Sequence, residues 1–175
     1  DNFIDRCKSS GFKAMCLTVD TVVAGNRERD HRWGFTTPPK LTLKSLMSFA
    51  SHPKWALNYL THEKFQLANV SHWTKKGSSI AKGVMEYINE QYDPAMSWKD
   101  AEYVVKKWGG PFALKGVMSV EDAKRAVEIG ASAIMLSNHG GRQLDGSRSP
   151  FDQLPAIADA VGGKIEIILD GGVRR

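Results

Sequence analysis

Residues 111–137, PFALKGVMSVEDAKRAVEIGASAIMLS, decide the fold class of this chain. The two short apolar runs at its ends, 111–117 and 133–137, have the character of buried parallel strands. Between them, Ser119 with an acid three residues later predicts the start of a helix, and Gly130 predicts its end. A strand, a helix and a second strand in this order are typical of a parallel α/β sheet or barrel.

The same alternation continues on both sides of this segment. Residues 12–20 and 165–169 are further apolar runs of strand length. Helices are expected over 2–10, 99–108 and 152–161. Because fully apolar strands alternate with helices throughout, the sequence predicts an α/β fold with a parallel sheet.

The stretch between residues 21 and 97 has no strand of comparable quality. The charge cluster at 26–30 is expected to be a solvated loop, and weak helical patterns cover 41–50, 55–60 and 79–89. A connection of this length inside a compact domain is usually functional or disordered.

Composition limits the class of protein. Of the 175 residues, 42% are hydrophobic and 25% are charged, which excludes a wholly disordered or collagen-like chain. Since no run of 18 apolar residues occurs, no segment is expected to span a bilayer. Cys7 and Cys16 are expected to be reduced thiols in a cytoplasmic protein. The chain begins without Met and stops straight after an apolar run, so we expect a piece of a longer protein.

The basic character of the chain is concentrated in residues 31–76. This segment holds seven Lys and Arg residues, one acid and three of the five Trp residues. Basic and aromatic residues together favour attachment to an anionic membrane surface, on which the protein would lie rather than span it. The alternative is an active-site lid whose aromatic rings pack on the barrel or on a neighbouring subunit.

Polar and glycine-rich residues follow each predicted strand. They are Asp20, Lys115 with Gly116, residues 138–142, and Asp170 with Gly171 and Gly172. In parallel α/β folds, ligands and catalytic groups gather at the carboxyl ends of the strands. We therefore expect these residues to form one site.

His139 and Arg142 are the strongest candidates within that site. His139 titrates near neutrality and precedes two glycines, and Arg142 offers a planar fork that matches a carboxylate or phosphate. A surface His beside a solvated Arg is the structural alternative. The position after a buried strand, with Asp20 available to orient the imidazole, favours catalysis.

The remaining strand-end residues indicate an anionic ligand. Lys115 requires an anion or an electron-rich ring nearby if it is partly buried, although a solvated lysine is equally compatible with the pattern. The glycines after Asp170 could expose backbone N–H groups to a phosphate, although a simple turn is the commoner meaning of Gly-Gly. The other histidines lack metal-ligand spacing, so no metal site is expected.

Five motifs in order carry a resemblance to a known family. They are LTVD at 17–20, RERD at 27–30, LKG at 114–116, SNHGGRQLD at 137–145 and DGGVRR at 170–175. Together they resemble the FMN-dependent α-hydroxy acid dehydrogenase and oxidase family, which includes L-lactate dehydrogenase, glycolate oxidase and mandelate dehydrogenase. The segment GFTTPPK at 34–40 is similar to the lactate-dehydrogenase-like bacterial members.

The resemblance implies that residues 1–175 are part of a TIM (β/α)8 barrel. Strands four to seven of that barrel would lie at 13–19, 112–116, 133–137 and 165–169. The basic, aromatic-rich segment 31–97 would be a long insertion after strand four. Strands one to three and strand eight would lie outside this chain, so the fragment alone is expected to be inactive.

The family implies a role for each matching residue. His139 would be the catalytic base, Asp20 would stabilise its imidazolium form, and Arg27 and Arg142 would bind the substrate carboxylate. The residues implied in FMN binding are Thr18, Lys115, Ser137, Asp170, Gly171, Gly172 and Arg174.

The implied reaction is the oxidation of an L-2-hydroxy acid, with L-lactate first in line, to the 2-oxo acid. Electrons would pass through FMN to a quinone, cytochrome or oxygen, and hydride and carbanion routes both stay open. Family resemblance further implies a homo-oligomer, in the cytoplasm or peripheral on the inner membrane, with no nucleic-acid partner. The alternatives are another FMN- or phosphate-binding TIM-barrel oxidoreductase, or a membrane-surface module without catalysis.

Overall fold

The computed structural model describes residues 2–22, 25, 28–33, 42–62, 93–144 and 146–174. The chain divides into two compact units. Asp1–Asn26 and Tyr92–Arg175 form the first unit, and Arg27–Gln91 form the second.

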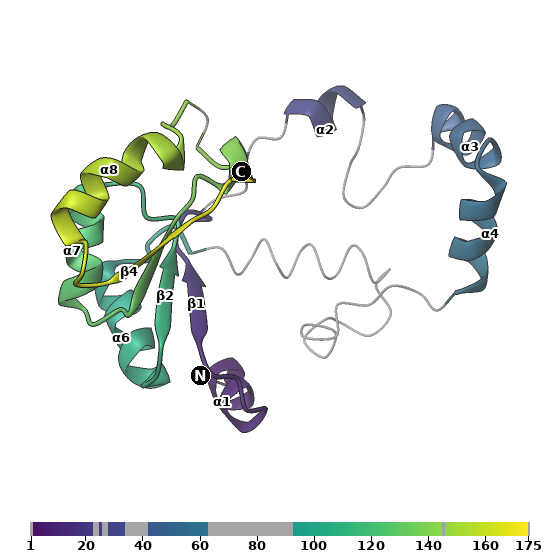
Figure 1. Ribbon diagram of the computed structural model, residues 1–175. Coiled ribbons are helices and arrows are strands. Elements are labelled where there is room, and N and C mark those ends of the chain that lie inside the picture. The colour runs from purple at the N-terminus through teal and green to yellow at the C-terminus, as the bar shows by residue number, and fades with distance from the viewer. Residues whose placement is uncertain are drawn as a thin grey trace. The chain divides into compact units, whose positions relative to one another are not determined.

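A four-stranded parallel sheet is the centre of the first unit (Figure 1). Its strands are β1 (Met15–Thr18), β2 (Phe112–Lys115), β3 (Ala133–Leu136) and β4 (Glu166–Leu169), in the order β1-β2-β3-β4. Each neighbouring pair is parallel. The predicted α/β fold is thus confirmed, with strand order and direction as expected for consecutive strands of a partial barrel.

Four helices accompany this sheet: α1 (Asn2–Ser9), α6 (Trp98–Trp108), α7 (Val120–Glu128) and α8 (Pro150–Val161). Helices α6, α7 and α8 lie on one side of the strands (Figure 1). Helix α8 begins at Pro150 rather than at residue 152. Proline fits the first turn of a helix because the N–H that it lacks would have no partner there.

The three helices beside the sheet begin with the same arrangement, a serine followed three residues later by an aspartate. Ser119 Oγ accepts the backbone N–H of Asp122 at 3.0 Å, and the hydroxyl and N–H of Ser97 donate to Asp100 at 2.7 and 2.8 Å. Ser149 caps α8 in the same way, with 3.2 Å between its Oγ and the N of Asp152. These contacts satisfy N–H and hydroxyl groups that a helix start would otherwise leave without partners.

The hydrophobic core lies between the sheet and its helices. The largest side chains with almost no exposed surface are Phe112, Leu114, Val117, Ile134, Leu136, Ile157 and Val161. Successive residues of a strand point to opposite faces, so Lys115 lies on the face away from this core. The sheet thereby separates an apolar helix-covered face from a face that carries polar groups at its carboxyl edge.

The second unit contains three described helices, α2 (Glu28–Trp33), α3 (Leu43–Ala50) and α4 (Pro53–Thr61). Helices α3 and α4 confirm the weak helical patterns, whereas the expected helix at 79–89 lies outside the described residues. The expectation of a loop at the charge cluster was wrong over α2, where Arg32 and Glu28 form an ion pair of 2.9 Å one turn apart. Within the described ranges, no helix is long and apolar enough to cross a membrane.

Candidate functional site

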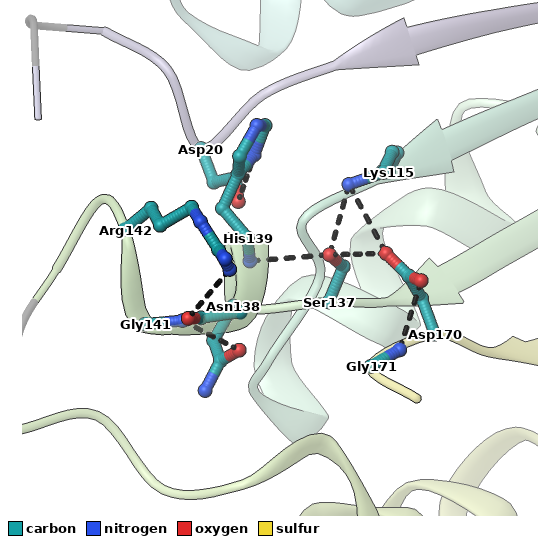
Figure 2. A network of polar contacts seen from close by, with 10 residues as sticks. Asp20, Lys115, Ser137, Asn138, His139, Gly141, Arg142, Asp170 and Gly171 are labelled. Carbon is teal, nitrogen blue, oxygen red and sulfur yellow. Dashed lines mark hydrogen bonds and ion pairs between the residues drawn. The ribbon is translucent and has the colours of Figure 1, made fainter. Parts of the chain in front are cut away.

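Side chains from all four strand ends meet at the carboxyl edge of the sheet (Figure 2). Asp20 follows β1, Lys115 ends β2, Ser137 and His139 follow β3, and Asp170 follows β4. The sequence predicted this grouping for Asp20, Lys115, His139 and Asp170, because parallel strands place their carboxyl ends together. Ser137 was expected at this site only from the family resemblance.

The side chain of Ser137 connects three of these strand ends by hydrogen bonds. Its hydroxyl, on a residue that is only 1% exposed, donates to Asp170 Oδ2 at 2.8 Å. The same oxygen accepts from Lys115 Nζ at 2.9 Å and from the backbone N–H of His139 at 3.2 Å. A serine hydroxyl has one proton and two lone pairs, so these three bonds use its whole capacity.

Lys115 and Asp170 form an ion pair around this hydroxyl, with 3.3 Å between Nζ and Oδ2. The other carboxylate oxygen of Asp170 accepts the N–H of Gly171 at 2.8 Å. Hydrogen bonding from Ser137 first, and then from Lys115 and Gly171, lowers the pKa of Asp170 against an opposing effect of burial. Asp170 is therefore held as an anion beside a half-buried cation.

His139 faces Asp20 across the site. Its Nδ1 lies 3.2 Å from Oδ2 and 3.3 Å from Oδ1 of Asp20. A carboxylate can only accept a hydrogen bond, so in the neutral imidazole the contact assigns the proton to Nδ1 and the lone pair to Nε2. The Asp20 side chain is 14% exposed and that of His139 is 32% exposed, so solvent reaches the imidazole more than its partner.

The backbone around His139 is strained and locally supported. His139 has φ 58°, and Gly140 and Gly141 follow with φ 64° and 68°, so three consecutive residues occupy the left-handed region. The Asn138 side chain accepts the N–H of Gly141 at 3.2 Å and donates to the carbonyl of Arg148 at 3.3 Å. A non-glycine residue in this region is uncommon, and the hydrogen bonds of Asn138 support the turn that requires it.

Arg142 ends this left-handed turn, three residues after His139. Its Nη1 donates to the carbonyl of Gly140 at 3.2 Å, and the residue is exposed. The turn therefore places a guanidinium and an imidazole on one short loop. Such a pair can bind a carboxylate and accept a proton from a neighbouring group.

The sequence placed Gly116 among the strand-end residues but did not predict its close approach to Asp20. Gly116 has φ 104°, and a methyl group at its Cα would lie 2.7 Å from Cβ and 2.8 Å from Cγ of Asp20. Real Cβ atoms do not approach this closely, so only glycine lets the aspartate rest against the end of β2. The only sequence signal was a glycine directly after a strand.

The structure describes most of the other residues that were predicted for the site. Thr18 is paired with Lys115 in the β1–β2 register. Gly171 and Gly172 have φ 114° and 86°, and Arg174 beyond them is exposed. Arg27 lies outside the described residues. In the part of the chain that the structure describes, no three His, Cys, Asp or Glu side chains are grouped to hold a metal ion.

Sequence comparison relates the whole chain to one family of enzymes. The family model for FMN-dependent dehydrogenases matches residues 1–175. The chain is 40% identical over 174 residues to the L-lactate dehydrogenase of Pseudomonas entomophila (strain L48), and 42% identical over 174 residues to that of Yersinia pestis (strain Pestoides F). Each alignment covers 99% of this chain but 45% of the relative, so the chain spans less than half the length of the curated relatives it matches.

Solved structures give the same relationship. The monotopic membrane protein (S)-mandelate dehydrogenase is similar with a TM-score of 0.89 and 31% identity, covering 99% of this chain and 45% of that one. A putative lactate oxidase of Pediococcus acidilactici is similar with a TM-score of 0.67 and 32% identity, covering 99% and 38%. The predicted placement within a TIM barrel agrees with these neighbours.

We expect Gly116→Ala to destabilise the intact protein more than Gly130→Ala does. Both glycines have positive φ, but a methyl group at Gly130 meets nothing within 4 Å, whereas at Gly116 it meets Asp20. Both variants thus carry the backbone strain of roughly 1 kcal/mol, and only Gly116→Ala adds the overlap. Denaturant unfolding measures the difference, and equal losses would contradict the close approach to Asp20.

Asp170 should make stability depend on pH at the acid end. Because its pKa is lower in the folded state, its contribution is present above the unfolded value of about 3.9 and is lost as the pH falls through the folded value. We expect Asp170→Asn to be less stable than the parent at neutral pH, with the two unfolding curves converging below about pH 4. Asp159→Asn, at an exposed position of α8, is the control. A difference in unfolding free energy between Asp170→Asn and the parent that stays constant with pH would contradict the prediction.

Proposed function

The chain belongs to the FMN-dependent dehydrogenase family, and on that premise we propose that the intact protein oxidises an L-2-hydroxy acid to the 2-oxo acid. L-lactate is the substrate that we propose first, since the two curated relatives named above are L-lactate dehydrogenases. The observation that carries the proposal is the contact between His139 Nδ1 and Asp20, with Arg142 on the same turn. A base beside a carboxylate-binding group suits a substrate that carries a hydroxyl next to a carboxylate.

His139 would take a proton from the substrate, from the hydroxyl in the hydride route or from Cα in the carbanion route. Its contact with Asp20 leaves Nε2 as the basic atom, and the carboxylate of Asp20 stabilises the imidazolium that forms. Solvent exposure of the imidazole is consistent with access for a small substrate. Asp20 thus acts on charge and orientation while His139 moves the proton.

Arg142 would bind the substrate carboxylate through its planar guanidinium. A two-point contact of this kind fixes the direction of the Cα–H and Cα–OH bonds, which supplies the proximity part of catalysis. We propose Arg27 as a second arginine on the family resemblance alone, as the residue lies outside the described range.

FMN is the cofactor of the family, and the residues at the strand ends fit it. The Lys115 side chain, 21% exposed, presents a cation on the face away from the core. Gly171 and Gly172 leave open space where side chains would stand, because a methyl group meets only Pro150 at 3.8 Å or nothing at all. Such a loop, followed by Arg174, suits a phosphate. When bound, FMN supplies the acceptor for the two electrons that leave the substrate.

The residues proposed to hold FMN are Thr18, Lys115, Ser137, Asp170, Gly171, Gly172 and Arg174. Among them, we propose that Ser137 acts mainly by orienting Lys115, since its hydroxyl already makes three hydrogen bonds. Asp170 balances the charge of Lys115 and aligns the first glycine of the loop.

Helices α3 and α4 carry a second proposal, contact with an anionic membrane surface. Large apolar side chains of both helices are exposed, among them Leu46, Met47, Leu57 and Leu60, the last at 79%. Phe49, Trp55 and Tyr59 stack in a row, with ring centroids 5.2 and 5.4 Å apart. Apolar and aromatic groups flanked by lysines suit the interfacial zone of a bilayer. The similar (S)-mandelate dehydrogenase is described as a monotopic membrane protein.

The proposed acceptor of the electrons is a quinone, a cytochrome or oxygen, and the proposed assembly is a homo-oligomer. Membrane attachment favours an acceptor in or on the bilayer. We place the protein in the cytoplasm or on the inner face of the membrane as part of the same proposal.

We expect His139→Gln to slow the anaerobic reduction of bound flavin by L-lactate about 10²-fold or more, since a general base contributes at least this much. His52→Gln, an exposed histidine before α4, is the matched control and should keep the parental rate. Stopped-flow absorbance measures both. Reduction of His139→Gln at the parental rate would remove His139 as the base. A parent that no 2-hydroxy acid reduces would favour a different FMN-dependent barrel enzyme.

Membrane attachment predicts that Leu57→Ser/Leu60→Ser co-sediments several-fold less than the parent with vesicles containing anionic lipid. Each basic residue near such a surface contributes roughly 1 kcal/mol, so high salt should weaken the binding of the parent. Tyr103→Ser, an exposed aromatic position on α6, is the control and should bind as the parent does. Absent binding of the parent at low salt, or unchanged binding after deletion of residues 40–76, would contradict the proposal. Dissociation of an oligomer by the leucine changes, without lipid, would assign these helices to a subunit contact instead.

A further inference from the structure

Asp20 and His139 come from strands that do not pair with each other. Strand β2 lies between β1 and β3 in the sheet, so no backbone ladder links the loop after β1 to the loop after β3. The last hydrogen bond of the sheet before Asp20 is made by Val19, whose N–H donates to the carbonyl of Lys115 at 2.8 Å. The distance between the carboxylate and the imidazole therefore depends on contacts outside the sheet ladders, of which the close approach of Gly116 to Asp20 is one.

Gln143 supplies such a contact. Its side-chain Nε2 donates to the backbone carbonyl of Asp20 at 3.2 Å. Gln143 lies on the same loop as His139 and directly after Arg142. One residue thus ties the loop with the imidazole and the guanidinium to the backbone of the aspartate that faces the imidazole.

Gly25 shows that the two loops fit closely at this point. A methyl group on its Cα would overlap the carbonyl of Arg142 and the side-chain oxygen of Gln143. The Gln143 amide therefore lies against both Gly25 and Asp20, two residues of the loop after β1. A side chain held from both sides can transmit the position of one loop to the other.

We propose that Gln143 is a positioning residue for the proposed reaction: it fixes the backbone of Asp20 so that the carboxylate stays within hydrogen-bond distance of His139 Nδ1. The proposal rests on the proposed function, since it assigns Gln143 to the support of a base. Gln143 touches neither the substrate nor the reacting atoms in this role. It acts through Asp20.

The test is Gln143→Met in the intact flavoprotein, which keeps the length of the side chain and removes the donor. We expect flavin reduction by L-lactate to slow about tenfold, the change that corresponds to one ordinary hydrogen bond. Gln153→Met is the matched control, because Gln153 also donates from Nε2 to a backbone carbonyl, that of Met118 at 2.7 Å. The control should reduce its flavin at the parental rate.

A double-mutant cycle separates positioning from a general loss of structure. If Gln143 acts through Asp20, then Gln143→Met should change the rate less than about twofold in an Asp20→Asn background. The pH–rate profile of the single variant should also move toward that of Asp20→Asn, which a merely structural role would not cause. Additive effects with an unmoved profile would overturn the proposal. If Gln143→Met fails to fold, Gln143→Asn serves in its place, because it keeps an amide but is too short to reach the carbonyl.

A measurement without substrate distinguishes failure of this proposal from failure of the proposed function. The imidazole nitrogens of His139, assigned by their absence in His139→Gln, can be followed by NMR in the labelled protein. The Gln143→Met signal should shift toward that of Asp20→Asn whether or not L-lactate is oxidised. An unchanged signal in a protein that does oxidise L-lactate would reject the role of Gln143 alone.

Discussion

The hydroxyl of Ser137 is the interaction on which the polar edge of the sheet depends. It is almost fully buried and is bonded to a cation from β2, an anion after β4 and the backbone N–H of His139. A buried polar group is stable only when its hydrogen bonds are satisfied, so this serine fixes three neighbouring strand ends relative to one another. Because both Lys115 and Asp170 are hydrogen-bonded to Ser137, their ion pair is held in one geometry.

Two acid–base pairs flank this hydroxyl, and they differ in design. Lys115 and Asp170 belong to strand ends joined through Ser137, and the pKa of Asp170 is lowered by that hydroxyl above all. His139 and Asp20 lie on loops without a common ladder, and their approach needs a glycine at position 116 and the amide of Gln143. The first pair is an ion pair fixed by a buried hydroxyl, in the part of the edge that we propose for FMN. The second contains an imidazole whose residue has a left-handed backbone, which is consistent with a functional position.

The sequence predicted the strands and most helices of the first unit because apolar runs, serine caps and terminal glycines all indicated the same elements. It missed α2, whose six residues show charges rather than an apolar period, and it placed the start of α8 too late because Pro155 obscured the helix that Pro150 begins. The grouping of Asp20, Lys115, His139 and Asp170 followed from parallel topology. The roles of Gly116 and Gln143 did not, since they depend on how closely two loops pass, a distance that no periodicity or composition encodes.

The apolar side chains of the two units differ in burial: those of the first unit form a core, and many of those in the second unit are exposed. In the first unit, apolar side chains of the strands form one buried core with those of α6, α7 and α8, and the polar groups of the site lie at the carboxyl edge of the sheet. In the second unit, α3 and α4 are short and amphipathic, yet their leucines and aromatic rings stay exposed although the two helices pack on each other. Exposed apolar groups in such number support the proposed contact with an anionic membrane surface. The proposed chemistry and the proposed attachment thus rest on separate parts of one chain.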